Sequence, residues 1–187
     1  MSAFATILIG LWVASEIALG LTRRSGARGG ESLDRSSLRV LWLTILLSVG
    51  AGVLLAGSRY GALAGRPAVW ESAGVSLVLA GLVIRWAAIL SLKRSFTVDV
   101  AVAKDQRVVE TGLYRWVRHP SYAGSLLSFA GFGWTLRHWT SLAVIVVPIT
   151  AAFLYRIHVE EEALRAGLGE AYASYARRTK RLVPFVY

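Results

Sequence analysis

The chain has 187 residues, of which 55% are hydrophobic and only 17% are charged, and its formal net charge is +10. This composition is too apolar for an ordinary soluble domain, so we expect an integral membrane protein with a single domain over residues 1–187. The absence of cysteine excludes a disulfide framework, a thiolate metal site and a cysteine nucleophile. The three histidines are too dispersed for a recognisable metal motif, so no metal is expected.

Five apolar stretches predict an all-α integral membrane protein with five transmembrane helices. The first three, at 3–21, 38–56 and 69–92, are long enough for the roughly 20 residues that a spanning helix needs. The last two, at 121–136 and 141–157, are shorter and are separated by a polar turn. We therefore predict that they form a hairpin of short or tilted helices.

The first apolar stretch differs from a signal peptide, because no basic residue precedes it and Glu16 lies inside it. We interpret it as a retained helix. Glu16 and Arg85 both fall within apolar spans, where a charged side chain normally needs a partner or a wet cavity. A structural ion pair and a role in substrate access are both open interpretations of these two residues.

The distribution of lysine and arginine predicts the topology. The positive-inside rule places the N-terminus outside and the C-terminus in the cytoplasm, together with the loops that follow the first and third apolar stretches. Scattered basic residues favour contact with the bilayer and its anionic lipids over nucleic acid, which we do not expect as a partner. The loop between the second and third stretches holds only Arg59 and Arg66, whereas the two basic loops and the tail hold Arg23, Arg24, Arg28, Arg35, Arg39, Lys93, Arg94, Lys104, Arg107, Arg115, Arg118, Arg165, Arg177, Arg178, Lys180 and Arg181.

A polar triplet, Arg118-His119-Pro120, lies where the second basic loop meets the fourth apolar stretch. Proline suits the first position of a helix, and the residue before it is pushed towards an extended conformation. His119 is therefore expected to cap the helix, beside free backbone N–H groups that favour an anionic ligand. The alternative is that Arg118 and His119 are interfacial residues that simply end a membrane helix.

A second group of ionisable residues, Arg156 and Glu160-Glu161-Glu162, follows the last apolar stretch. Arg156 and Glu160 are four residues apart, so they could form a simple pair on an exposed helical extension. Against this, three consecutive carboxylates repel one another, and ionisable groups that converge at a membrane face are often functional. Both groups lie on the same predicted side of the membrane, so we expect them to meet.

These motifs carry a family resemblance. Leu113–Gly124, followed by Arg156-x3-Glu160-Glu161 and by Gly169-Glu170-x-Tyr172, resembles the isoprenylcysteine carboxyl methyltransferase family, which is related to the membrane phospholipid methyltransferases. The resemblance covers about residues 90–187. It implies that 1–92 contributes three helices without a family signature and that 93–187 holds the cofactor-binding and catalytic part.

The resemblance also implies a pocket for S-adenosylmethionine near the cytoplasmic face, formed by the 93–120 loop and the C-terminal segment. It implies that Arg156 and Glu161 are catalytic, with Arg156 towards the transferred methyl group and the acceptor. The residues implied to bind the cofactor are Val109, Gly112, Tyr114, Arg118, His119, Tyr122 and Glu160.

The family name suggests carboxyl O-methylation of an isoprenylcysteine-like, lipophilic acceptor, whether a small molecule or a prenylated protein. An ionised carboxylate needs no base, and Arg156 could orient it by a two-point contact. N-, O- or S-methylation of a lipid amine, a phenolic lipid or a small thiol stays open, and Glu161 or His119 would then remove the proton. A non-catalytic membrane scaffold or small-molecule binder is the competing class.

Overall fold

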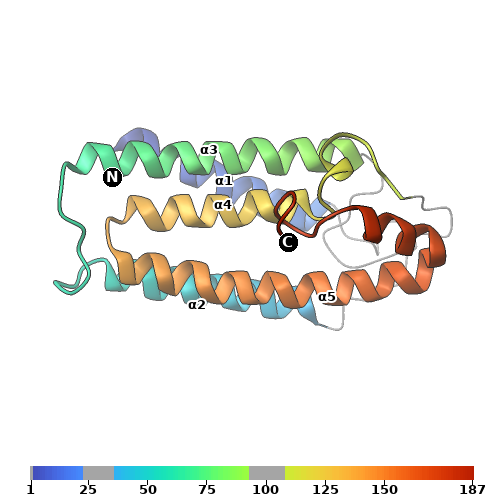
Figure 1. The fold of residues 1–187 in the computed structure, drawn as a ribbon. Coiled ribbons are helices and arrows are strands. Elements are labelled where there is room, and N and C mark those ends of the chain that lie inside the picture. Colours follow the sequence, from blue (N-terminus) through green and yellow to red (C-terminus); the bar gives the residue numbers. More distant parts are fainter. Residues whose placement is uncertain (1, 23–35, 93–107) are drawn as a thin grey trace.

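The computed structural model describes residues 2–22, 36–92 and 108–187, and these residues form an all-helical bundle (Figure 1). The all-α part of the predicted fold class is confirmed. Most of the two basic loops, including residues 93–107 of the predicted cofactor loop, lies outside the described residues. The helices are α1 (Ala3–Thr22), α2 (Ser37–Leu55), α3 (Pro67–Leu92), the 3-10 helix η3 (Gly112–Arg115), α4 (Pro120–Thr135) and α5 (Trp139–Arg178).

Four of these helices, α1, α2, α3 and α5, are long and apolar enough to cross a membrane, which agrees with an integral membrane protein. Helix α4 has only 16 residues, a length of about 24 Å at a rise of about 1.5 Å per residue. The hydrocarbon core of a bilayer is roughly 30 Å thick. The count of five transmembrane helices therefore stays a prediction.

Helix α5 has 40 residues and continues far beyond the apolar stretch that predicted it. Hydrophobicity ends near residue 157, but the glutamate, alanine, leucine and arginine residues that follow are strong helix formers and extend the helix. Gly169 interrupts this extension with φ 55° and ψ −132°, a conformation that glycine adopts at little cost. The last turns of α5 then run back towards the bundle (Figure 1).

Helix α4 packs between α3 and α5, α2 packs on α5, and α1 touches α3 only lightly (Figure 1). The contact of α3 with α4 is close because glycines face each other: a Cβ on Gly124 would lie 2.6 Å from the carbonyl oxygen of Gly81. Small residues allow such approach between membrane helices. The apolar core of the bundle includes Trp12, Phe129 and Phe153.

The C-terminal tail, residues 179–187 after α5, returns to the start of α4. Val117 and Lys180 form an isolated parallel bridge. The N–H of Arg118 donates to the carbonyl of Lys180 at 2.7 Å, and the N–H of His119 donates to the carbonyl of Arg181 at 3.0 Å. These contacts fix the tail beside the polar triplet and bring the two predicted functional segments to one end of the bundle.

Candidate active site

Pro120 is the first residue of α4 and His119 occupies the cap position, as predicted. The His119 side chain, however, makes no capping hydrogen bond. The backbone N–H groups of Arg118 and His119 are satisfied by carbonyls of the tail, so the prediction that free N–H groups wait here for an anion is wrong for these two residues. The physical reason is a tertiary contact with a segment about 60 residues away, which no local pattern reveals.

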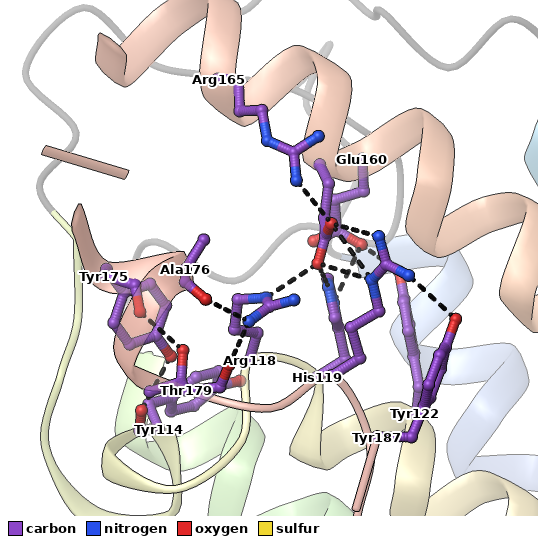
Figure 2. A network of polar contacts seen from close by, with 12 residues as sticks. Tyr114, Arg118, His119, Tyr122, Glu160, Arg165, Tyr175, Ala176, Thr179 and Tyr187 are labelled. Atoms are coloured by element: carbon purple, nitrogen blue, oxygen red, sulfur yellow. Dashed lines mark hydrogen bonds and ion pairs between the residues drawn. The ribbon is translucent and has the colours of Figure 1, made fainter. Parts of the chain in front are cut away.

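Glu161 is a buried carboxylate surrounded by basic side chains, among them Arg118, His119 and Arg165, which Figure 2 shows. Its side chain is only 1% exposed. It accepts hydrogen bonds from Arg118 Nε at 2.8 Å, Arg181 Nη2 at 3.1 Å and Arg165 Nη2 at 3.2 Å. His119 Nε2 lies 3.3 Å from the same carboxylate. One carboxylate thus ties the triplet, α5 and the tail together.

The tail contributes more than one contact to this network. Arg118 also donates through Nη1 to the carbonyls of Ala176 and Thr179, and Arg181 donates through Nη1 to the hydroxyl of Tyr187 at 3.0 Å (Figure 2). The hydrogen bond to Glu161 raises the pKa of Arg181. Arg181 is therefore a permanent cation beside Glu161.

A second row of polar groups lies next to Glu161 and reaches towards the apolar core. The hydroxyl of Tyr122 donates to Glu160 Oε2 at 2.7 Å and accepts from Arg156 Nε at 3.1 Å. The Tyr122 ring lies parallel to the His119 ring, with centroids 5.5 Å apart. His119 Nδ1 is 3.8 Å from Glu160 Oε2. Tyr122 therefore links the two sequence motifs directly, and the expectation that they meet is confirmed.

The two partners of Tyr122 differ in exposure. The Glu160 side chain is 29% exposed, whereas Arg156 is 2% exposed and donates through Nη1 to the hydroxyl of Ser37 at 2.9 Å. Glu160 can thus reach a ligand on the polar side of the site. Ser37 on α2 and Tyr122 on α4 both hold the Arg156 guanidinium, which lies on the side of the site that faces the apolar core.

Tyr114 supports this arrangement from η3. Its ring is buried, and burial raises the pKa of its hydroxyl far above the ordinary value. The Tyr175 hydroxyl donates to the backbone carbonyl of Tyr114 at 2.7 Å. Tyr114 can therefore donate a hydrogen bond but does not act as a base at neutral pH.

An apolar cavity of about 420 Å³ begins at Tyr122 and Arg156. Its walls come from α1, α2, α3, α4 and α5, so all three helices that were predicted to carry no family signature contribute to it. The side chains at its polar end are Glu16, Arg85, Tyr122, Ser125 and Arg156, and its apolar walls include Ile9, Trp12, Leu41, Val49, Phe129, Phe132 and Phe153.

The predicted site residues therefore fall into two sets. The structure joins Arg118, His119, Tyr122, Glu160, Glu161 and Arg156 in one continuous network. Tyr114 is linked to Arg118 indirectly, through Tyr175 and Thr179. Val109 is half-buried in the stretch before η3, and Gly112 begins η3 with φ 62°. These two precede the network along the chain. The catalytic and cofactor-binding roles of all the predicted site residues stay predictions. Within the described residues, no cluster of histidine and acidic side chains could hold a metal ion.

Sequence reasoning missed several partners in this network. Arg165 follows Glu161 by four residues, a spacing that could have indicated the pair. Ser37 and Arg181 gave no such signal, because Ser37 is 119 residues from Arg156 and Arg181 is 20 residues from Glu161 across the break at Gly169. Contacts at these separations depend on the tertiary fold.

Comparisons with known proteins match the part of the chain that holds the site. Residues 74–166 match the sequence profile of the isoprenylcysteine carboxyl methyltransferase (ICMT) family. This segment includes Arg118, His119, Tyr122, Arg156 and the Glu160–Glu161 pair, and it leaves out α1 and α2.

Curated relatives match over a similar part of the chain. The protein-S-isoprenylcysteine O-methyltransferase B of Arabidopsis thaliana is 33% identical over 115 residues, which are 60% of this chain and 58% of the relative. The protein-S-isoprenylcysteine O-methyltransferase of Mus musculus is 30% identical over 122 residues, which are 63% of this chain and 42% of the relative. The matched part thus spans between about two fifths and three fifths of these relatives.

A solved structure shares the fold. The structure of a eukaryotic intramembrane Ras methyltransferase, an isoprenylcysteine carboxyl methyltransferase, superposes with a TM-score of 0.64 at 24% identity. The superposition covers 78% of this chain and 52% of that protein. The arrangement of helices is therefore shared with a solved membrane methyltransferase.

Proposed function

Because the chain belongs to the isoprenylcysteine carboxyl methyltransferase family, we propose that it is an S-adenosylmethionine-dependent methyltransferase of a lipophilic acceptor. The favoured reaction is O-methylation of the carboxylate of an isoprenylcysteine-like compound. One observation of the structure supports this best: the Tyr122 hydroxyl joins the part-exposed carboxylate of Glu160 to the buried guanidinium of Arg156 at the polar end of an apolar cavity. A polar cofactor and an apolar acceptor would meet at this point.

The residues on the polar side fit S-adenosylmethionine, which would supply an electrophilic methyl group on a sulfonium. Glu160 is part-exposed and only one of its oxygens receives the Tyr122 hydroxyl, so it can accept hydrogen bonds from ribose hydroxyls or an ammonium group. The Tyr172 hydroxyl is buried without a hydrogen-bond partner among the described residues. Such a group is a candidate to meet a ligand.

The residues on the apolar side fit a carboxylate with a hydrocarbon tail. Arg156 would orient the carboxylate, since Ser37 and Tyr122 already hold its guanidinium in place. The aromatic walls would exclude water from the attacking oxygen and keep the tail in an apolar environment. A carboxylate that gains a methyl group releases no proton, so this reaction needs no general base.

The buried position of Glu161 bears on the choice of acceptor. Its carboxylate already receives three guanidinium groups and lies beside His119. We assign Glu161 the role of holding the site together, which favours an acceptor that needs no proton removed. A lipid amine, a phenolic lipid or a small thiol would need a base from elsewhere in the site.

We also place the site on the cytoplasmic side of the membrane, with the N-terminus outside. This placement rests on the basic residues that follow α1 and α3 in the sequence and on the basic tail. The described ends of α1 and α3 and the tail lie at the same end of the bundle as the site (Figure 1). The cofactor would arrive from water at this end, and the lipophilic acceptor would arrive from the bilayer.

Binding and transfer experiments on the detergent-solubilised protein test this function. We expect S-adenosylmethionine to bind by calorimetry and its labelled methyl group to appear on an isoprenylcysteine with a free carboxylate. No binding at millimolar cofactor would instead support a scaffold. Binding with transfer to a lipid amine or thiol but not to the carboxylate would support the alternative acceptors.

A further inference from the structure

An ion pair between α1 and α3 lies at the polar end of the cavity and has no part in the network around Glu161. Arg85 Nη2 donates to Glu16 Oε2 at 2.5 Å, and Arg85 Nε donates to the other oxygen of the same carboxylate. The contact is therefore a two-point pair. The side chains of Arg85 and Glu16 are only 10% and 17% exposed.

Such a pair is costly to keep inside a membrane helix bundle. Two charges must leave water, and their attraction often does no more than offset that loss. Holding α1 in place does not by itself account for the pair, because the N–H of Ser2 already donates to Glu71 on α3 at 2.8 Å. The pair also lines a cavity, whereas the Ser2–Glu71 contact is exposed at the other end of α1.

The Glu16–Arg85 pair lies where the polar head of an amphiphile would lie if its tail filled the cavity. Glu16 and Arg85 lie within about two turns of the helix ends that surround the site, beside Tyr122 and Arg156. From Tyr122 the cavity runs along α4 to Phe132, a distance of about 15 Å for ten residues. Only this end of the cavity carries ionisable side chains among the described residues.

Resting on the proposed function, we infer that the Glu16–Arg85 pair sets the charge preference of this cavity, which takes a single-tailed amphiphile with an anionic head. Each partner cancels the charge of the other where the head would lie. Arg85 is further held by the carbonyl of Ser121, which its Nη1 approaches at 3.4 Å. Without Arg85, the carboxylate of Glu16 would face the head unscreened and repel an anion.

Substitutions of Arg85 and of Glu16 should change ligand affinity in opposite directions. If the pair only held α1 against α3, the two substitutions would have the same effect. Arg85→Gln leaves the negative charge of Glu16 and should weaken binding of an isoprenylcysteine carboxylate by roughly tenfold, while it strengthens binding of an amine with the same tail. Glu16→Gln leaves the positive charge of Arg85 and should shift both ligands in the opposite directions. The double substitution removes both charges and should return both affinities close to those of the unmodified protein.

The experiment measures displacement of a fluorescent lipid from each detergent-solubilised variant by the two ligands, so it needs no catalysis. Glu71→Gln is the matched control, because it removes the other carboxylate that ties α1 to α3 and should change neither affinity. If Arg85→Gln does not fold, Glu16→Gln and the double variant still test the inference. Adding Arg85→Gln to Glu16→Gln must then reverse the changes in affinity that Glu16→Gln causes alone.

Shifts of the same sign for anion and amine, or a control that behaves like the pair, would overturn the inference. If the opposite shifts occur but no methyl group is transferred, the charge preference stands and the proposed function fails.

Discussion

Glu161 and Glu162 are neighbours with opposite surroundings. The Glu161 side chain is 1% exposed and receives Arg118, Arg165 and Arg181. The Glu162 side chain is 43% exposed, and one of its oxygens lies 3.3 Å from Nε2 of His158, four residues earlier. Adjacent residues on a helix point about 100° apart, so one faces the bundle and the other faces solvent.

This difference gives a matched prediction. Glu161→Gln should lower stability by on the order of 3 kcal/mol, because it leaves the buried guanidinium of Arg118 without its carboxylate and also removes the partner of Arg165 and Arg181. Glu162→Gln should change it by less than about 1 kcal/mol, as for other exposed pairs. Thermal unfolding of the two variants in detergent measures the difference. Equal melting temperatures would show that the buried network contributes little.

A substitution at Arg156 can separate the contribution of the guanidinium geometry from that of its positive charge. Arg156→Lys keeps the positive charge, but an ammonium group cannot reach Tyr122 and Ser37 and also make a planar two-point contact with a carboxylate. We expect the variant to fold, to bind S-adenosylmethionine normally and to lose at least roughly tenfold in kcat/KM for the acceptor. A fully active lysine variant would mean that only charge matters at this position.

At the residue scale, the sequence predicted the polar cluster but not its internal arrangement. The motifs around His119 and Glu160 named most of the network, because short spacings and a helix start can be recognised locally. The assignment of Glu160 to the open side and Glu161 to the closed side follows from contacts with the tail, and no spacing in the sequence distinguishes these two carboxylates.

At the scale of elements, the contact between α3 and α4 depends on residues without side chains. The Cβ of Gly124→Ala would lie 2.7 Å from the backbone nitrogen of Arg85, so the two helices would have to separate. The same contact places Arg85 beside the start of α4. Packing of α3 against α4 thus also positions the polar end of the cavity.

Gly124→Ala should therefore cost roughly 1–3 kcal/mol, as other overpacked substitutions do, and should also weaken acceptor binding. Gly10→Ala in α1 is the control, because a Cβ there meets nothing within 4 Å. Alanine is a better helix former than glycine, so the control should be as stable as the unmodified protein or slightly more so. Thermal unfolding and lipid displacement on both variants check this; a stable Gly124→Ala protein would show that the helices can move apart freely.

The apolar stretches predicted the helices well, since α1 to α4 begin and end within two residues of them. The part of α5 after about residue 164 was not predicted, because its residues are mostly polar and only helix propensity supports them. The break at Gly169 was equally hidden. A glycine in a polar helix can be an ordinary residue or a reversal, and the return of the tail to α4 decides between them.

At the scale of the whole molecule, the site, the tail and the ends of α1 and α3 that lead into the basic loops share one end of the bundle. The loop between α2 and α3, at the opposite end, holds only Arg59 and Arg66 as basic residues. The absence of cysteine makes the proposed topology directly testable. Arg59→Cys, in the loop between α2 and α3, should react with a membrane-impermeant maleimide added to intact cells. Lys180→Cys should react only after the membrane is permeabilised. The reverse pattern would place the site outside and contradict the proposed cytoplasmic source of cofactor.

The gap between α1 and α2 is the path by which we expect the acceptor to reach the cavity. Helices α1 and α2 both line it but do not pack closely on each other, and Val13 on α1 and Leu46 on α2 are 49% and 70% exposed at its edge. We expect a lipid tail to enter from the bilayer between these two helices. Keeping each CH₂ in hydrocarbon is worth roughly 0.8 kcal/mol, so shortening the tail should raise KM steeply.

A bulky maleimide on Val13→Cys should then raise KM for a long-tailed acceptor while leaving the affinity for S-adenosylmethionine unchanged, because the label would obstruct the path of the tail only. Leu11→Cys is the control, since Leu11 is 64% exposed on the same helix but does not line the cavity. Labelling both variants and measuring kinetics with long-tailed and tail-free acceptors separates the cases. A tail-free acceptor that is turned over as efficiently as a lipophilic one would rule out access from the bilayer, and the site would then serve a small acid or thiol that arrives from water.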